Sequence, residues 1–151
     1  MVYNLRKGAA TVEELTGGAI FPDQFGLTQI KTHALVAGGR GAFKAVYSVL
    51  SISKDGQQIA EKASLNVARG CFPLAALKER FVFATGGFNN DWLRECERYD
   101  FKSNTWKNLP ALLRKRFFHA SASFRDEFVY VFCGYAGFGQ FLSSIERYTL
   151  S

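Results

Sequence analysis

Few residues of this chain could do chemistry, and they are widely spaced. The 151 residues include two histidines, His33 and His119, and three cysteines. A zinc or copper site needs three or four convergent ligands, and no cluster along the sequence supplies them. Gly38-Gly39-Arg40-Gly41 lacks the lysine and spacing of a phosphate-binding loop, and no Ser-His-acid grouping is visible. We therefore predict no catalytic residue, no metal site and no cofactor, and expect that the protein is not an enzyme.

Composition favours a folded domain with an ample core. Hydrophobic residues make up 48% and aromatic residues 15%, which argues against disorder. No apolar run is long enough to cross a membrane and the N-terminus lacks the apolar segment of a signal peptide, so we predict no membrane span and a cytoplasmic location. Cys71, Cys96 and Cys133 are odd in number and far apart, and are expected to be buried, reduced thiols. The net charge of +6 is shared by both halves and favours solubility over nucleic-acid binding.

The elements that must position any site are best defined in residues 69–112. Gly86-Gly87 end a strand-forming run, Tyr99 follows twelve residues after Gly87, and Trp106 follows seven after that. Proline cannot donate to a ladder, so Pro110 fits the exit of an outer strand. Four short antiparallel strands are predicted, over 72–77, 81–85, 95–101 and a fourth that holds Trp106.

The glycine pair recurs at a period near 50, so the chain is an array of repeats. It returns as Cys133-Gly134 in a downstream copy, residues 114–150. Tyr148 takes the tyrosine position there, and the chain stops before a fourth strand.

The upstream copy, residues 21–65, is degenerate. Gly38-Gly39 follow its second strand, whereas Ile52 and Ile59 stand where tyrosine and tryptophan are expected. Residues 1–15 look like the last two strands of a further copy.

The glycine pair and the spaced rings are accompanied by an arginine at a fixed distance upstream, Arg69 before Gly86 and Arg116 before Cys133. Together these features resemble the kelch repeat. In that family each repeat is one blade of a β-propeller. The resemblance implies an all-β fold, a partial β-propeller of about three four-stranded antiparallel blades with the last blade incomplete. It also implies that the tyrosine and tryptophan pack between adjacent sheets and that the glycines allow close approach. The structural repeat positions are Gly38, Gly39, Gly86, Gly87, Tyr99, Trp106, Gly134 and Tyr148.

The resemblance also implies a face for binding other proteins, as scaffold or substrate-recognition unit. Related propellers gather on one face the loops equivalent to 40–46, 66–71, 88–95, 112–118 and 135–142. Arginine mixed with aromatic residues is typical of interface hot spots, and arginine pairs with carboxylate or phosphate. An acidic or phosphorylated protein segment is the expected partner. The candidate partner-binding residues are Arg40, Lys44, Arg69, Trp92, Arg94, Arg114, Arg116, Phe138 and Phe141.

Other roles stay open for several of these residues. Arg69 and Arg116 fall at a repeated position and either brace a loop or meet a ligand. Trp92 and Phe141 either contact a partner or fold back between blades, and Arg114-Lys115-Arg116 is also compatible with a solvated run. His119 follows Arg116 by three residues and is expected to be structural. A remnant of a sugar-processing or oxidising propeller enzyme and a nucleic-acid binder are the alternative functions.

Three blades do not close a ring, since propellers typically have four to eight. An open array exposes an apolar face and unpaired strand edges. Three explanations remain: a fragment of a longer protein, a homodimer in which two arcs complete a ring, or an open arc covered by a partner. In a homodimer the incomplete last blade could take Val12–Leu15 from the other chain.

Overall fold

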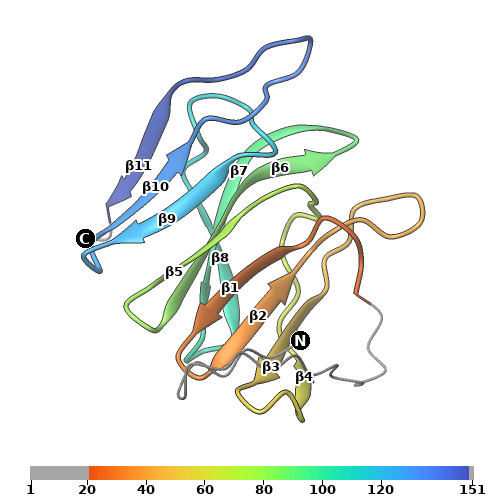
Figure 1. Cartoon of the computed structure of the whole chain (residues 1–151), viewed down its shortest axis with the longest axis vertical. Helices are drawn as coiled ribbons and strands as arrows, with labels where there is room; N and C mark the ends of the chain where they lie inside the picture. The colour runs from red at the N-terminus through yellow and green to blue at the C-terminus, as the bar shows by residue number, and fades with distance from the viewer. Residues whose placement is uncertain (1–20, 150–151) are drawn as a thin grey trace, which may run out of the picture.

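The computed structural model describes residues 21–149, and every regular element in that range is a β-strand (Figure 1). No helix in this part of the chain is long and apolar enough to cross a membrane. The proposed strands at 1–15 lie outside the described residues. The strands are β1 (Gly26–Ile30), β2 (His33–Ala37), β3 (Val49–Ser53), β4 (Ile59–Glu61), β5 (Leu74–Leu77), β6 (Phe81–Asn89), β7 (Asp91–Asp100), β8 (Thr105–Leu109), β9 (Ala120–Phe124), β10 (Phe128–Phe132) and β11 (Ile145–Thr149).

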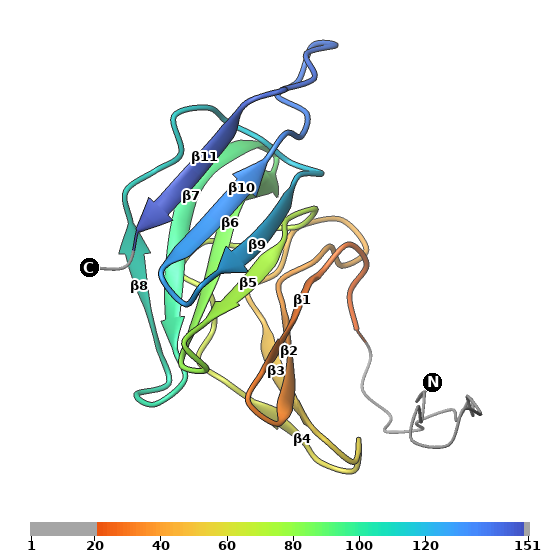
Figure 2. The ribbon, with the colours of Figure 1, turned by 60° about the vertical axis from the view of Figure 1, so that its left-hand side comes forward.

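The strands form three antiparallel sheets, and each sheet is a consecutive stretch of chain. The first has the order β1-β2-β3-β4, the second β5-β6-β7-β8, and the third β9-β10-β11. The first strands of the three sheets, β1, β5 and β9, run side by side (Figures 1 and 2). This is the all-β, partial β-propeller architecture that the resemblance implied, with a third blade of three strands.

Side-chain register explains the spacing of the rings. Tyr99 in β7 lies directly opposite Trp106 in β8, with ring centroids 5.0 Å apart. Ile52 and Ile59 face each other in the same way across β3 and β4. Directly opposed residues share one face of a sheet, so the seven-residue spacing places Tyr99 and Trp106 together on the face that meets the first blade. Ile52 and Ile59 share the equivalent face of the first sheet.

The hairpin of β6 and β7 is longer than expected. The sequence predicted a loop over 88–95, but pairing continues to Asn89 and Asp91. A bulge between Thr85 and Gly87 resets the register, after which the ladder resumes. Asn90, with φ of 58°, then closes the hairpin.

The core lies between the sheets. Leu35 and Val49 of the first sheet pack with Val82 and Tyr99 of the second, and all four are buried. The next interface joins Phe83 to Val129 and Tyr148. The positions of these rings agree with inter-blade packing of the repeated tyrosine.

The first glycine of each pair lies against the next blade. A Cβ on Gly38 would lie 2.4 Å from the carbonyl oxygen of Arg69, and one on Gly86 would lie 2.5 Å from that of Arg116. Cys133 occupies the same position in the last blade, with φ of 55°. It is exposed, so the expectation of three buried thiols is wrong for Cys133, because no described blade follows to cover it.

Candidate functional site

The longer loops lie together at one edge of the arc, opposite the short turns of the β1–β2 and β9–β10 hairpins (Figure 1). We call this edge the loop face. It comprises the β2–β3 loop, the tip of the β6–β7 hairpin, the β10–β11 loop, and the connections 66–71 and 112–118 between sheets. Contacts between aromatic rings link the parts of this face. The ring centroids of Phe88 and Phe117 are 5.8 Å apart, and those of Trp92 and Phe138 are 5.0 Å apart.

Arg69 is fully buried and braces the second blade from inside. Its guanidinium donates to the carbonyls of Gly86 and Glu95 at 2.6 and 2.8 Å. It also pairs with Glu97 at 2.8 Å, where both side chains are at most 1% exposed. Glu97 in turn accepts the backbone N–H groups of Asn66 and Val67. The pair therefore ties the connection between sheets to β7.

Arg116 does the same in the third blade. Its guanidinium donates to the carbonyl of Cys133 at 2.6 Å and to Glu146 at 2.6 Å. Glu146 accepts the N–H groups of Leu113 and Arg114, which are the repeat equivalents of Asn66 and Val67. Of the two roles that the sequence left open, the structure supports the loop brace for Arg69 and Arg116, since both side chains are 0% exposed.

The first blade has lost both partners of this pair. Gln24 and Cys71 are equivalent left-handed positions, so Pro22 stands where Arg69 is found. By strand register, Ile52 corresponds to Tyr99, so Leu50 stands where Glu97 is found. The first blade thus has no arginine at the Arg69 position and apolar Leu50 at the Glu97 position. No buried carboxylate is therefore left without a positive partner there.

His119 is a packed, neutral side chain. Its Nε2 lies 3.0 Å from the hydroxyl of Thr85, and the residue is 9% exposed. Burial, helped by the nearby charge of Arg116, lowers the pKa of His119 from 6.5 to about 3. Phe72 holds the equivalent position of the second blade, which agrees with a structural role.

The remaining candidates lie on the surface or at its edge. Lys44, Arg94 and Arg114 are exposed and have no ion pair among the described residues. Arg40 is half-buried, and its guanidinium carbon lies 5.4 Å from the ring centroid of Phe88. Lys115 is not isolated, since it pairs with Asp91 at 2.6 Å.

The aromatic candidates divide into two groups. Trp92 is half-buried and packs against Phe138, so it belongs in part to the fold. Phe138 is 92% exposed and Phe141 83% exposed. Phe43, on the β2–β3 loop, is also 92% exposed.

A largely apolar cavity of about 520 Å³ opens between the third blade and the β10–β11 loop. Phe117, Phe118, Tyr135, Phe141 and Leu142 supply most of its wall. Tyr135 packs on Phe141 with centroids 5.1 Å apart, and Phe118 is 65% exposed. The arrangement suits an aromatic or aliphatic side chain from a partner.

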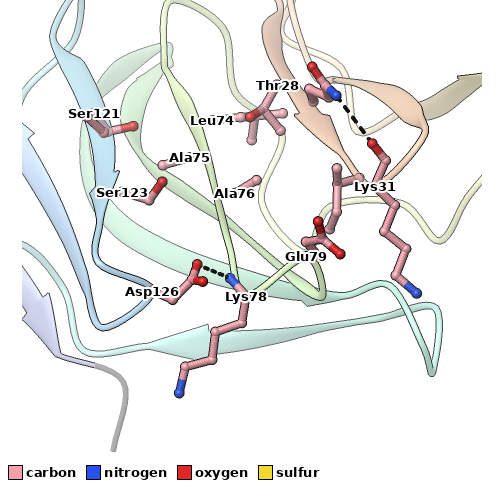
Figure 3. Close-up of a pocket in the computed structure, with 13 residues that line it drawn as sticks. Thr28, Lys31, Leu74, Ala75, Ala76, Lys78, Glu79, Ser121, Ser123 and Asp126 are labelled. Atoms are coloured by element: carbon pink, nitrogen blue, oxygen red, sulfur yellow. Dashed lines mark hydrogen bonds between the residues drawn. The ribbon is translucent and has the colours of Figure 1, made fainter. Parts of the chain in front are cut away.

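A second cavity, of about 500 Å³, lies where β1, β5 and β9 run side by side (Figure 3). Small side chains such as Ala75 and Ser121 line it, and the N–H of Lys78 donates to Asp126 at its rim. It contains none of the predicted binding residues. Within residues 21–149 no group of three His, Cys, Asp or Glu side chains could hold a metal ion.

Sequence reasoning missed Glu97, Glu146, Leu113 and Phe118. The two glutamates carried a signal, because they recur at nearly the same distance after Arg69 and Arg116. Leu113 is 86% exposed, and nothing in the sequence pattern indicates that this leucine lies on the surface.

Comparison with known proteins supports the repeat. The Kelch motif family model matches residues 82–113. Over 89 residues the chain is 39% identical to the human (Homo sapiens) Kelch-like protein 33, a match covering 58% of this chain and 16% of the relative. The motif and this relative support a general protein-interaction role. Together with three sheets repeated along the chain, these matches support the resemblance to the kelch repeat that the sequence indicated.

Proposed function

We propose that the loop face binds a segment of another protein that carries acidic or phosphorylated side chains next to an apolar residue. The observation that carries the proposal is the combination of the 520 Å³ apolar cavity with exposed arginines on the same edge. An apolar anchor would enter the cavity beside Phe141, and its charged neighbours would meet Arg94 or Arg114.

Charge distribution supports an anionic partner. The chain carries a net charge of +6, and Arg94 and Arg114 have no ion pair among the described residues, so a partner need not displace one. Arg69 and Arg116 are left out of this surface, because they are buried and engaged within their own blades.

In this role the chain is a non-enzymatic, cytoplasmic interaction module that acts as scaffold or substrate-recognition unit. A second copy of the chain is a further partner, which would complete the ring. The match covers 16% of the relative's length, so the function of the whole relative is not transferred to this chain.

The test is binding of a defined peptide library to the full chain. Fluorescent peptides that vary in acidic residues, phosphoserine and one aromatic anchor are measured by anisotropy. Peptides with both features are expected to bind best. Arg94→Glu and Arg114→Glu are each expected to weaken binding about tenfold, the loss of one charge-assisted contact of about 1.4 kcal/mol.

Lys102→Glu is the matched control, since Lys102 is an exposed cation on the β7–β8 turn, away from the loop face. It is expected to leave peptide affinity unchanged. Equal losses in all three variants, or equal affinity for acidic and neutral peptides, would contradict the proposal. Tight binding to RNA or DNA with a steep salt dependence would favour the nucleic-acid alternative instead.

A further inference from the structure

Neighbouring blades are joined by the same backbone contacts at each described interface. The N–H of Gly39 donates to the carbonyl of Arg69 at 2.8 Å, and the N–H of Gly87 donates to that of Arg116 at 2.9 Å. In both cases the second glycine of one blade contacts the arginine position of the next.

A second contact runs along the first strands. Gln24, Cys71 and Phe118 hold equivalent positions of the repeat and share a left-handed backbone, with φ of 57°, 56° and 50°. The N–H of Cys71 donates to the carbonyl of Gln24 at 2.8 Å, and the N–H of Phe118 donates to that of Cys71 at 3.0 Å. Each blade therefore offers one donor and one acceptor to the blade that follows it.

The two ends of the arc carry the unused halves of these contacts. At the last blade, the N–H of Gly134 and the carbonyl of Phe118 have no partner within residues 21–149. At the first blade, the same holds for the carbonyl of Pro22 and the N–H of Gln24. The donor of one end matches the acceptor of the other at both positions.

The side chains at the last blade's outer face are aromatic. Phe128, Tyr130 and Phe132 alternate along β10 with centroids about 6.1 Å apart, and Phe124 joins Tyr130 from β9. Phe124 is 50% exposed, and it lines a cavity of about 330 Å³ with Tyr130, Phe132 and the 58% exposed Ile145.

The outer face of the first blade is aliphatic. Ile52 and Ile59 occupy it in place of the tyrosine and tryptophan, and Leu27 on β1 is 56% exposed. At the interface of the first and second blades the rings of Tyr99 and Trp106 meet aliphatic Leu35. At the described interface, small aliphatic side chains of one blade meet the rings of the next. At the two ends of the arc the order is reversed, with rings on the last blade and isoleucines on the first. A face with large side chains would therefore still meet a face with smaller ones.

We propose that a second copy of this chain covers the last blade, head to tail, with its first blade in the place of a fourth. The inference rests on the second copy named in the proposed function, and it specifies the surfaces: the Tyr130 face of one copy against the Ile52 face of the other. Because both copies present both surfaces, two such contacts close a ring of six blades, within the four to eight of known propellers.

Cys133 modulates this contact. At the two described interfaces, a Cβ at its position would lie 2.4 or 2.5 Å from the incoming carbonyl. The Cys133 side chain therefore holds the second copy farther out than the other interfaces allow. Cys133→Gly removes this obstacle and is expected to tighten the dimer at least tenfold.

The first experiment measures the mass of the full chain by native mass spectrometry and by light scattering between 1 and about 200 µM. The wild-type chain and Cys133→Gly are expected to reach twice 16.9 kDa, with the variant doing so at lower concentration. A monomer in both proteins overturns the proposal. A mass that keeps rising with concentration overturns the closed ring.

The second experiment separates head-to-tail from other dimers. Tyr130→Asp and Ile52→Lys are each expected to give monomers, and their equimolar mixture is expected to dimerise again. In the mixed ring one interface is wild type, and the other sets the introduced aspartate against the introduced lysine, so the charges pair. A dimer that survives either single change, or a mixture that stays monomeric, counts against the assignment.

Two controls keep the result interpretable. Phe43→Asp changes a 92% exposed ring on the loop face and is expected to leave the mass unchanged. Circular dichroism and thermal unfolding verify that each variant folds, and the wild-type and Cys133→Gly masses stand independently of the charged variants. Loss of peptide binding in Arg94→Glu without a change in mass would separate the loop-face proposal from this one.

Discussion

The hydroxyl of Tyr148 donates to the carbonyl of Pro110 at 2.5 Å, and the equivalent carbonyl one repeat earlier accepts from a tryptophan. There, the indole N–H of Trp106 donates to the carbonyl of Ala63 at 2.9 Å. Ala63 and Pro110 hold equivalent positions of the repeat. In the last described blade, the same acceptor is therefore satisfied by the repeated tyrosine.

Tyr148→Phe is therefore expected to lower the free energy of unfolding by about 1 kcal/mol, since it leaves the Pro110 carbonyl without this donor. Chemical denaturation measures the change. Tyr47→Phe is the control, because Tyr47 is 52% exposed and its hydroxyl has no described partner. An equal loss in both variants would contradict the assigned bond.

Removal of Arg69 tests the buried brace. Arg69→Met is expected to lower the free energy of unfolding by about 3–5 kcal/mol, because it leaves the carboxylate of Glu97 buried without its partner. The double variant Arg69→Met with Glu97→Leu is expected to recover part of that loss, since the first blade folds with Pro22 and Leu50 at these positions. Additive losses in the double variant would contradict the coupling.

Gly86→Ala probes the close approach of blades. A methyl group there would lie 2.5 Å from the carbonyl oxygen of Arg116, at a φ of 54°. We expect a loss of at least about 2 kcal/mol in stability, by the combined effect of strain and overpacking. Cys133→Ala, at the equivalent position of the last blade, is expected to change stability by less than about 0.5 kcal/mol. Thermal and urea unfolding compare the two, and similar losses would show that the next blade does not set the requirement for glycine.

His119 makes stability depend on pH. Its pKa is about 3 in the folded chain and near 6.5 when unfolded, so the unfolded state binds the proton first as the pH falls. The stabilisation is complete above pH 6.5 and is lost as the pH drops toward 3, with a slope of at most about 1.4 kcal/mol per pH unit.

The variant that isolates this effect is His119→Phe with Thr85→Ala, which recreates the pair formed by Phe72 and Ala37 in the preceding repeat. Unfolding is followed by denaturation from pH 7.5 to 4.5. The difference in slope between wild type and variant reports His119 alone, because the carboxylates are common to both. Parallel profiles would show that His119 keeps its ordinary pKa in the folded chain.

The sequence was sufficient for the sheets, because each blade is local in the chain and its strand, glycine and ring positions recur at one spacing. The sequence did not show whether Arg69 and Arg116 brace a loop or bind a ligand. A basic residue beside a loop looks the same in sequence whether its guanidinium points to solvent or into the blade. Only the placement of Glu97 and Glu146 decides between the two, and those partners come from the following hairpin.

The extended hairpin of β6 and β7 escaped prediction for a related reason. Gly86-Gly87 reads as the end of a strand, whereas the bulge there lets pairing resume as far as Asn89. The exposure of Cys133 depends on whether another blade follows, which is a property of the assembly and not of the local sequence.

The position of the Arg69–Glu97 pair in the chain favours folding one blade at a time during synthesis. Arg69 leaves the ribosome before its partner Glu97, and Tyr99 can be buried only against a first sheet that is already in place. Each sheet therefore completes itself within one repeat and then docks on its predecessor, which suits N-to-C emergence. During translation, the face that each sheet presents to its successor is open to aggregation only until the next sheet docks on it.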